Sequence, residues 1–141
     1  MGPVLPVKIL VVCTHNAVRS QMAEAFFRSH AADRFTTHSA GTDPTQVDPR
    51  TIQVMNEVGI DLADYTAKSI KEFVGQHIHY VITVCEQARQ SCPNFPGALE
   101  KLHWDLPDPQ TASGTPEEQL DFFRSIRYTI RKNVNAFLAT H

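Results

Sequence analysis

Apolar residues fall along this chain in two patterns, short continuous runs and longer stretches with helical spacing. The run from Lys8 to Val12 is short, almost wholly apolar and followed by polar residues, which predicts a buried strand. From Ser20 onward, apolar residues recur at helical spacing, at Met22, Ala23, Phe26 and Phe27. This spacing predicts an amphipathic helix directly after the first strand and its loop.

The same alternation continues to the end of the chain. Further strands are predicted over residues 36–39, 77–84 and 99–104, and further helices over residues 48–60, 69–75 and 115–141. The last helix begins at Thr115-Pro116, and its predicted apolar face comprises Leu120, Phe123, Ile126, Ile130, Val134, Phe137 and Leu138. Strands that alternate with helices favour a three-layer α/β fold, in which a doubly wound parallel sheet of four strands is flanked by helices.

Length and charge narrow the class of protein. The 141 residues suit a single domain over 1–141, with Met1 to Pro6 expected as a flexible lead. A net charge of −2 gives no support to a basic surface for nucleic acid or for a membrane. No apolar run approaches the ~20 residues of a membrane span, and the N-terminus lacks the charged region of a signal peptide. We therefore expect a cytoplasmic protein, and a monomer because no apolar stripe is left over once the sheet is covered.

The three cysteines, Cys13, Cys85 and Cys92, are the first candidate chemistry. An odd number argues against a structural disulfide framework, and the histidines do not fall at zinc-ligand spacing, so no metal is expected. Cys13 follows the first strand and Cys85 follows the third. If these strands are neighbours, about 4.8 Å apart, both thiols lie at one rim of the sheet, where such folds bind ligands.

The loop between the first strand and the first helix has the composition of an anion site. Backbone N–H groups of such a loop, together with the helix N-terminus, attract an oxyanion and are expected to lower the pKa of Cys13. Arg19 supplies a bidentate guanidinium, Ser20 a hydrogen bond to sulfur, and Asn16 tolerates left-handed backbone. The oxyanion-binding candidates are Thr14, His15, Asn16, Ala17, Val18, Arg19 and Ser20. The alternative is a small apolar Cys followed by a solvated Arg.

Five stretches together resemble a known family. "CTHNAVRSQMAEAF" (13–26) resembles the phosphate-binding loop and first helix of arsenate reductases built on the low-molecular-weight protein tyrosine phosphatase fold. "HSAGT", "EVGIDL", "VITVCEQARQSCP" and "HWDLPDP" resemble later landmarks of that family in the same order. The resemblance covers the chain from about Lys8 to its end. It implies the flavodoxin-like strand order of that fold.

The resemblance also implies roles for individual residues. Cys13 would attack arsenate, Arg19 would hold the oxyanion, and Asp108 would protonate the departing oxygen; Asp105 lacks the following Pro and is expected to be a loop carboxylate. A disulfide would then pass from Cys13–Cys85 to Cys85–Cys92. No tightly bound cofactor is implied; thioredoxin would be the external reductant, and phosphate would compete with arsenate.

The spacing of the last two cysteines limits the conformations in which they can form a disulfide. In a helix, Cys85 and Cys92 would lie about 10.5 Å apart along the axis, whereas a disulfide needs Cα atoms within roughly 7 Å. The segment would therefore have to rearrange, and Pro93 and Pro96-Gly97 favour this. We expect a mobile segment from about Glu86 to Gly97, with Cys92 partly exposed. The alternative is a pair of buried, inert cysteines.

Some positions depart from the family pattern. His15 stands where many relatives carry Gly, and Lys68 stands where some relatives have an acidic ligand to potassium. We expect Lys68 to replace the ion and to pair with Glu24. Gln110-Thr111 follow Asp108-Pro109, where phosphatase relatives carry aromatic residues.

Three other functions compete with the reductase coupled to thioredoxin. They are a phosphatase that uses Cys13, Arg19 and Asp108, a reductase coupled to glutathione or mycothiol, and a non-enzymatic oxyanion or redox sensor.

Overall fold

A computed structural model describes residues 6–141, so the predicted lead of Met1 to Pro6 lies almost wholly outside the described residues. In chain order the elements are β1 (Val7–Cys13), α1 (Arg19–Ala31), β2 (Phe35–Gly41), α2 (Pro49–Asn56), η1 (Ile70–Phe73), β3 (Tyr80–Thr83), α3 (Glu86–Ser91), β4 (Glu100–His103), η2 (Pro109–Thr111) and α4 (Pro116–Thr140). The four strands form one parallel sheet in the order β2-β1-β3-β4. The predicted fold class and strand order are confirmed.

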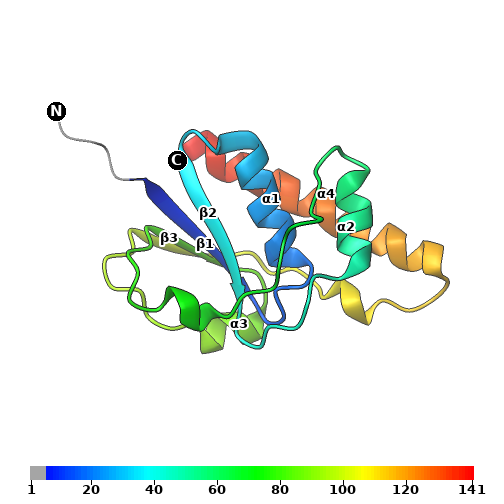
Figure 1. The fold of residues 1–141 in the computed structure, drawn as a ribbon, viewed down its shortest axis with the longest axis horizontal. Helices are drawn as coiled ribbons and strands as arrows, with labels where there is room; N and C mark the ends of the chain where they lie inside the picture. The colour runs from blue at the N-terminus through cyan, green and yellow to red at the C-terminus, as the bar shows by residue number, and fades with distance from the viewer. Residues whose placement is uncertain (1–5) are drawn as a thin grey trace.

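The apolar pattern explains how the layers pack. Strand β1 lies in the middle of the sheet, and its residues from Ile9 to Val12 are fully buried, as expected for a parallel strand covered on both faces. Helices α1, α2 and α4 are grouped on one side of the strands in Figure 1. Helix α4 buries five of its seven predicted apolar positions, Phe123, Ile126, Ile130, Val134 and Phe137. Leu120 and Leu138 are partly buried.

The third strand is shorter than the predicted 77–84. The backbone N–H of Lys8 donates to Nδ1 of His79 (3.0 Å) and not to a carbonyl, while the N–H of His79 donates to the carbonyl of Lys8 (3.0 Å). A side chain thus replaces one backbone partner, and the regular strand begins at Tyr80. The segment predicted to be mobile contains a regular helix, α3, which begins directly after Cys85 and ends before Cys92.

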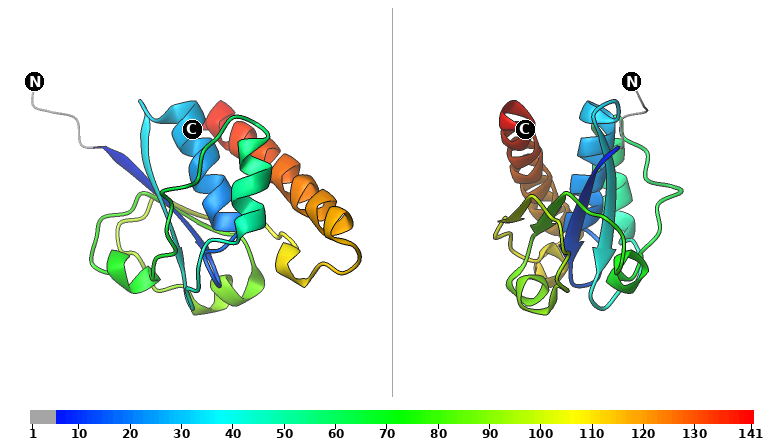
Figure 2. Two further views of the ribbon diagram at one scale, coloured as in Figure 1. Left: turned by 45° about the vertical axis from the view of Figure 1, so that its right-hand side comes forward. Right: turned by 90° about the vertical axis from the view of Figure 1, so that its left-hand side faces the viewer.

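The carboxyl ends of the parallel strands meet at one edge of the sheet. Cys13 ends β1, Gly41 ends β2, and Cys85 lies two residues beyond the end of β3. Figure 2 (left) shows α3 at this edge, beside the turns that follow β1 and β2. Within residues 6–141, none of the helices combines the length and the apolar character needed to cross a membrane.

Candidate active site

The loop that follows β1 is held from outside by the segment that follows β2. Backbone N–H groups of residues 42–48 donate to its carbonyl oxygens: Thr42 to Cys13 (3.1 Å), Asp43 to Thr14 (2.8 Å), Thr45 to His15 (3.1 Å) and Asp48 to Ala17 (3.1 Å). In a trans peptide the C=O and the next N–H point in opposite directions. The N–H groups of the loop are therefore directed away from the 42–48 segment, as an anion site requires.

Gly41 allows these two segments to approach each other. A Cβ atom at position 41 would lie 2.5 Å from the carbonyl oxygen of Thr14 and 3.0 Å from the backbone nitrogen of Asn16. The first distance is too short for any side chain. The oxyanion loop therefore requires glycine at the end of β2.

Asn16 holds the shape of the loop from inside. It has a φ of 53°, and its side chain is fully buried. Its Nδ2 donates to the hydroxyls of Ser20 (2.7 Å) and Ser39 (2.9 Å). Its Oδ1 accepts from Gln21 Nε2 (2.9 Å) and the backbone N–H of Lys68 (2.8 Å). The side-chain amide thus donates two hydrogen bonds and accepts two, so the left-handed backbone predicted for this residue is held in place by its side chain.

A buried carboxylate lies behind this network. Ser39 donates to Glu24 Oε1 (2.8 Å), and Nζ of Lys68 lies 3.6 Å from the same oxygen. Arg28 lies 3.5 Å from the other carboxylate oxygen. The predicted Glu24–Lys68 pair is thus confirmed. Within residues 6–141, no cluster of three or more His, Cys, Asp or Glu side chains is placed to hold a metal ion.

The thiol of Cys13 is buried among hydrogen-bond donors. Its Sγ lies 2.8 Å from the hydroxyl of Ser20 and accepts from the backbone N–H of Asn16 (3.1 Å). Burial nevertheless raises the pKa of Cys13 above its usual value, and the hydrogen bond with Ser20, the charge of Arg19 and the backbone donors only partly offset this. The expectation of a lowered pKa is wrong for this structure, because complete burial disfavours the thiolate more than the donors favour it.

Arg19 and Asp108 come together from opposite ends of the sequence. Nη1 of Arg19 donates to the carbonyl of Leu106 (3.0 Å), and Nη2 lies 3.9 Å from Asp108 Oδ1. The guanidinium is largely buried, whereas the Asp108 side chain is partly exposed. Asp108 also accepts from the backbone N–H of Gln110 (2.9 Å), which caps the short helix η2. The carboxylic acid predicted for proton transfer therefore stands beside the predicted oxyanion-binding arginine.

Cys85 reaches the oxyanion loop through one hydroxyl. Its Sγ lies 3.3 Å from Oγ1 of Thr14, the residue that follows Cys13. Cys85 is therefore in contact with the residue next to Cys13 in the loop, at the rim of the sheet where both thiols were predicted. Cys13 and Cys85 are buried and unoxidised in this structure.

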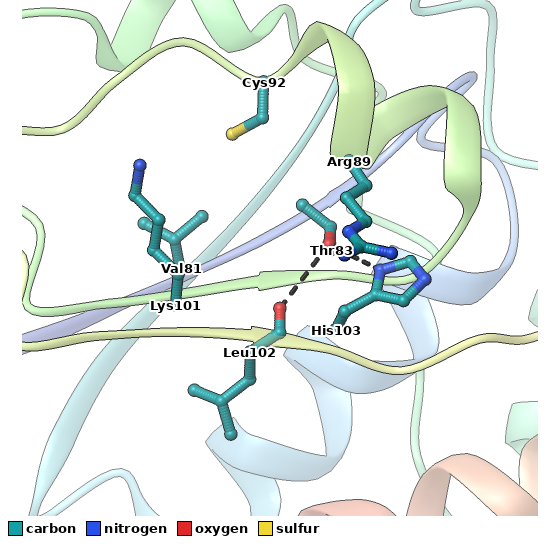
Figure 3. A pocket seen from close by; sticks show the side chains of 7 residues that line it. All are labelled: Val81, Thr83, Arg89, Cys92, Lys101, Leu102 and His103. Carbon is teal, nitrogen blue, oxygen red and sulfur yellow. Dashed lines mark hydrogen bonds between the residues drawn. The ribbon is translucent and has the colours of Figure 1, made fainter.

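Cys92 lies apart from the other two thiols, at the far end of α3. It is half-buried, and it borders a cavity of about 320 Å³ lined by Val81, Thr83, Arg89, Cys92, Lys101, Leu102 and His103. Figure 3 shows its thiol above β3 and β4, with the Lys101 side chain extending toward it. Burial raises the pKa of Cys92, and the charge of Lys101 acts against it. The structure thus brings two of the three predicted thiols together and leaves the third one helix length away.

Sequence reasoning missed polar side chains that support the loop. Gln21 is fully buried and donates through Nε2 to the carbonyls of Asn16 (3.0 Å) and Thr66 (2.9 Å). Thr51 donates to the carbonyl of Ala17 (2.9 Å). Gln21 and Thr51 each lie in the first turn of a helix, α1 and α2 respectively. A polar residue beside the apolar stripe, at the first turn of a helix, was the available clue.

Comparison with known proteins agrees with this geometry. Residues 8–140 match the family model for low molecular weight phosphotyrosine protein phosphatase. An arsenate reductase of Halalkalibacterium halodurans is 36% identical over 132 residues, which cover 94% of this chain and 95% of that protein. A solved arsenate reductase in an oxidised state superposes with a TM-score of 0.81 at 30% identity and covers 94% of this chain and 96% of its own.

A thioredoxin-dependent arsenate reductase of Corynebacterium glutamicum has a TM-score of 0.70 at 28% identity. That match covers 96% of this chain and 64% of the other. The family match spans nearly the whole sequence, and it includes every residue of the loop and all three cysteines. The chain therefore belongs to the low molecular weight phosphotyrosine protein phosphatase family, in the group that contains the arsenate reductases.

Proposed function

We propose that this protein reduces arsenate to arsenite with a relay of three thiols, Cys13, Cys85 and Cys92. The observation that carries the proposal is the position of Cys85, whose sulfur lies 3.3 Å from the Thr14 hydroxyl of the oxyanion loop. A phosphatase needs one nucleophilic thiol at this loop. A second thiol at the rim serves a reaction in which electrons leave the protein as a disulfide forms.

In the first step arsenate binds against the loop N–H groups and Arg19. The proton of Cys13 passes to the bound oxyanion, and the hydrogen bonds from Ser20 and Asn16 stabilise the thiolate that forms. The sulfur attacks arsenic, an S–As bond forms and an As–O bond breaks. Asp108 donates the proton with which the oxygen leaves as water.

In the second step the Cys85 thiolate attacks the sulfur of Cys13. An S–S bond forms, the S–As bond breaks, and its electron pair stays on arsenic. Arsenic(V) is thereby reduced to arsenic(III), which leaves as arsenite. Cys92 then attacks Cys85, which frees Cys13 and leaves a Cys85–Cys92 disulfide. This last exchange requires α3 to unwind, because its six residues separate the two cysteines.

An external dithiol completes the cycle. We assign this role to thioredoxin, because a dithiol protein reduces a disulfide such as Cys85–Cys92 in two successive thiol–disulfide exchanges, and because one structural relative is described as thioredoxin-dependent. We propose a cytoplasmic location, because an odd number of cysteines, three in all, argues against a structural disulfide framework. We further propose a monomer and a single domain, with phosphate as a competing ligand of the loop.

The test is arsenate-dependent NADPH consumption in the presence of thioredoxin and thioredoxin reductase. Wild type should turn over continuously, and Cys92→Ser should stop after one arsenite per protein molecule. Gln90→Ala, on α3 and two residues before Cys92, is the matched control and should turn over like wild type. Equal sustained turnover by Cys92→Ser would contradict the relay, because thioredoxin would then reduce the protein without Cys92. Turnover that appears only when glutathione or mycothiol replaces thioredoxin would indicate a low-molecular-weight thiol donor.

The second candidate function is phosphate monoester hydrolysis, favoured by the contact between Arg19 and Asp108 that such hydrolysis uses. The same proteins should be assayed with p-nitrophenyl phosphate. Hydrolysis that survives Cys85→Ser and Cys92→Ser, without any arsenate turnover in wild type, would make the protein a phosphatase. Oxyanion binding without either activity would indicate a sensor.

A further inference from the structure

Gln110 joins the segment that carries Asp108 to the segment that holds the oxyanion loop. Its Nε2 donates a hydrogen bond to Asp48 Oδ2 (3.2 Å). Asp48 comes directly before α2, whereas Gln110 belongs to η2, and Figure 1 shows this short helix (yellow) near the start of α2. The two residues are 62 positions apart in the sequence, so this contact is part of the tertiary structure.

Asp48 is an acceptor with a fixed orientation. Its side chain is buried, and Arg50 donates to both of its oxygens, through Nε to Oδ1 (3.0 Å) and through Nη2 to Oδ2 (2.7 Å). Burial raises the pKa of Asp48, but the hydrogen bonds from Arg50 and Gln110 outweigh burial and hold the pKa below its usual value. Gln110 therefore donates to a charged carboxylate, which makes the hydrogen bond stronger than one between neutral groups.

Asp48 is in turn fixed to the oxyanion loop. Its backbone N–H donates to the carbonyl of Ala17 (3.1 Å), which also accepts from the hydroxyl of Thr51 in the first turn of α2 (2.9 Å). Two hydrogen bonds on one loop carbonyl prevent the start of α2 from moving independently of the loop. The Gln110 side chain is therefore connected to the oxyanion loop through Asp48.

Asp108 lies between two contacts with the oxyanion site. Before it in the chain, the carbonyl of Leu106 accepts from Arg19 (3.0 Å). After it, Gln110 binds Asp48 with its side chain and donates its own backbone N–H to Asp108 Oδ1 (2.9 Å). Without the second contact the segment would be free to pivot about the first. The two contacts together set both the position of Asp108 and the direction of its carboxyl group.

We propose that Gln110 is a positioning residue for Asp108, and that its hydrogen bond to Asp48 holds this carboxyl group at the oxyanion bound by the loop. The inference rests on the proposed function in one respect, which is the role of Asp108 as the proton donor to the departing oxygen. Gln110 acts on the reaction through Asp108 alone. Substitution of Gln110 should therefore slow the chemical step and leave the affinity for the oxyanion unchanged.

The first measurement separates the chemical step from binding. It follows arsenite formation in a single turnover, with protein in excess over arsenate, and phosphate binding by calorimetric titration. A misplacement of about 1 Å costs about 100-fold in rate, and Gln110→Ala leaves the contact at Leu106 intact, so the rate should fall about tenfold. The dissociation constant for phosphate should change by less than about twofold. Gln76→Ala, an exposed glutamine that donates to the carbonyl of Glu72, is the matched control and should react like wild type.

Two further substitutions at the same position test the hydrogen bond itself. Gln110→Lys keeps a donor within reach of Asp48 and should recover most of the lost rate. Gln110→Glu has nearly the same shape but places a second carboxylate beside Asp48, so it should be at least as slow as Gln110→Ala. If Gln110→Lys is as slow as Gln110→Ala, the hydrogen bond to Asp48 does not control the rate and the proposal is overturned.

A double-mutant cycle shows whether Gln110 acts through Asp108. In an Asp108→Asn background the proton donor is already lost, so Gln110→Ala should cause no further loss of rate. A further tenfold loss in this background would overturn the proposal, because Gln110 would then act on another part of the site. An Asp108→Asn variant as fast as wild type would overturn it as well.

A last measurement does not depend on arsenate. The backbone N–H groups of residues 110–112 are hydrogen-bonded within their own segment, to the Asp108 side chain and to the carbonyls of Asp108 and Pro109. Their exchange with deuterium should be about fivefold faster in Gln110→Ala and close to wild type in Gln110→Lys. Unchanged exchange in Gln110→Ala would mean that Gln110 does not hold the segment, which overturns the proposal.

The two kinds of measurement distinguish failure of this inference from failure of the proposed function. If exchange responds as described but wild type does not reduce arsenate, the proposed function fails and the positioning of the segment by Gln110 stands. If wild type reduces arsenate and Gln110→Ala does so at the same rate, the role of Gln110 fails and the thiol relay stands.

Discussion

Replacement of Gly41 by alanine tests whether the oxyanion loop depends on close contact with β2. The new Cβ would lie 2.5 Å from the Thr14 carbonyl oxygen, where real Cβ atoms keep at least 3.0 Å. The contact is with backbone, so the loop has to move by about half an ångström or more. Overpacking of this kind costs about 1–3 kcal/mol of folding stability. Because catalytic geometry is sensitive to displacements of about 1 Å, oxyanion affinity should fall about tenfold.

Gly59→Ala is the matched control for this substitution. Gly59 has a φ of +81°, and nothing lies within 4 Å of an added Cβ, so the cost is backbone strain of about 1–2 kcal/mol far from the site. Urea unfolding should therefore show similar losses for both variants. Calorimetric titration with phosphate should show weaker binding only for Gly41→Ala. If phosphate affinity is the same in both variants, the loop does not depend on this contact and the reasoning is refuted.

Three further predictions concern charges and protons. Ser20→Ala removes a donor to Cys13, so the already raised pKa of that thiol should rise further, and alkylation of Cys13 at pH 7 should slow about fivefold; an unchanged pH profile would exclude Ser20 from thiolate stabilisation. Lys68→Ala should lower the folding stability by about 1–3 kcal/mol, because buried Glu24 loses one of its two cations. Potassium chloride should restore part of this stability and choline chloride should not. Equal effects of the two salts would contradict a cation role for Lys68. Glu57 has a pKa of about 2, held down by its hydrogen bonds with two arginines of α4, so its contribution to stability is complete above pH 4.5 and is lost as the pH falls toward 2. Because Glu57 is partly exposed, Glu57→Gln should cost about 1 kcal/mol at pH 7 and nothing near pH 2, as measured by urea unfolding at both values.

The sequence was sufficient to predict the fold, and it indicated Arg19, Cys85 and Asp108, which the structure places around the loop after β1. Both depend on signals that are local in the chain, namely apolar periodicity, the strand–loop–helix around Cys13, and the motif quoted for the first helix. The four hydrogen bonds from residues 42–48 to this loop have no such signal, because they join backbone groups of two segments that carry no periodic pattern. The pKa of Cys13 was predicted with the wrong direction for a related reason. Donors near the sulfur can be named from the sequence, whereas the extent of its burial depends on the packing of the whole domain.

The segment between Cys85 and Cys92 shows how a spacing argument and a structure complement each other. The spacing of Cys85 and Cys92 requires α3 to unwind before they can form a disulfide, and few buried side chains of this helix oppose the unwinding. Helix α3 has six residues, of which only Ala88 is buried, whereas α1 buries ten of its thirteen. An element with few buried side chains opens at low cost, while its neighbours remain folded. The Gln87 side chain joins α3 to the oxyanion site through the hydroxyls of Thr14 and Thr42, so loss of these two hydrogen bonds should favour the opening of the helix that the disulfide requires.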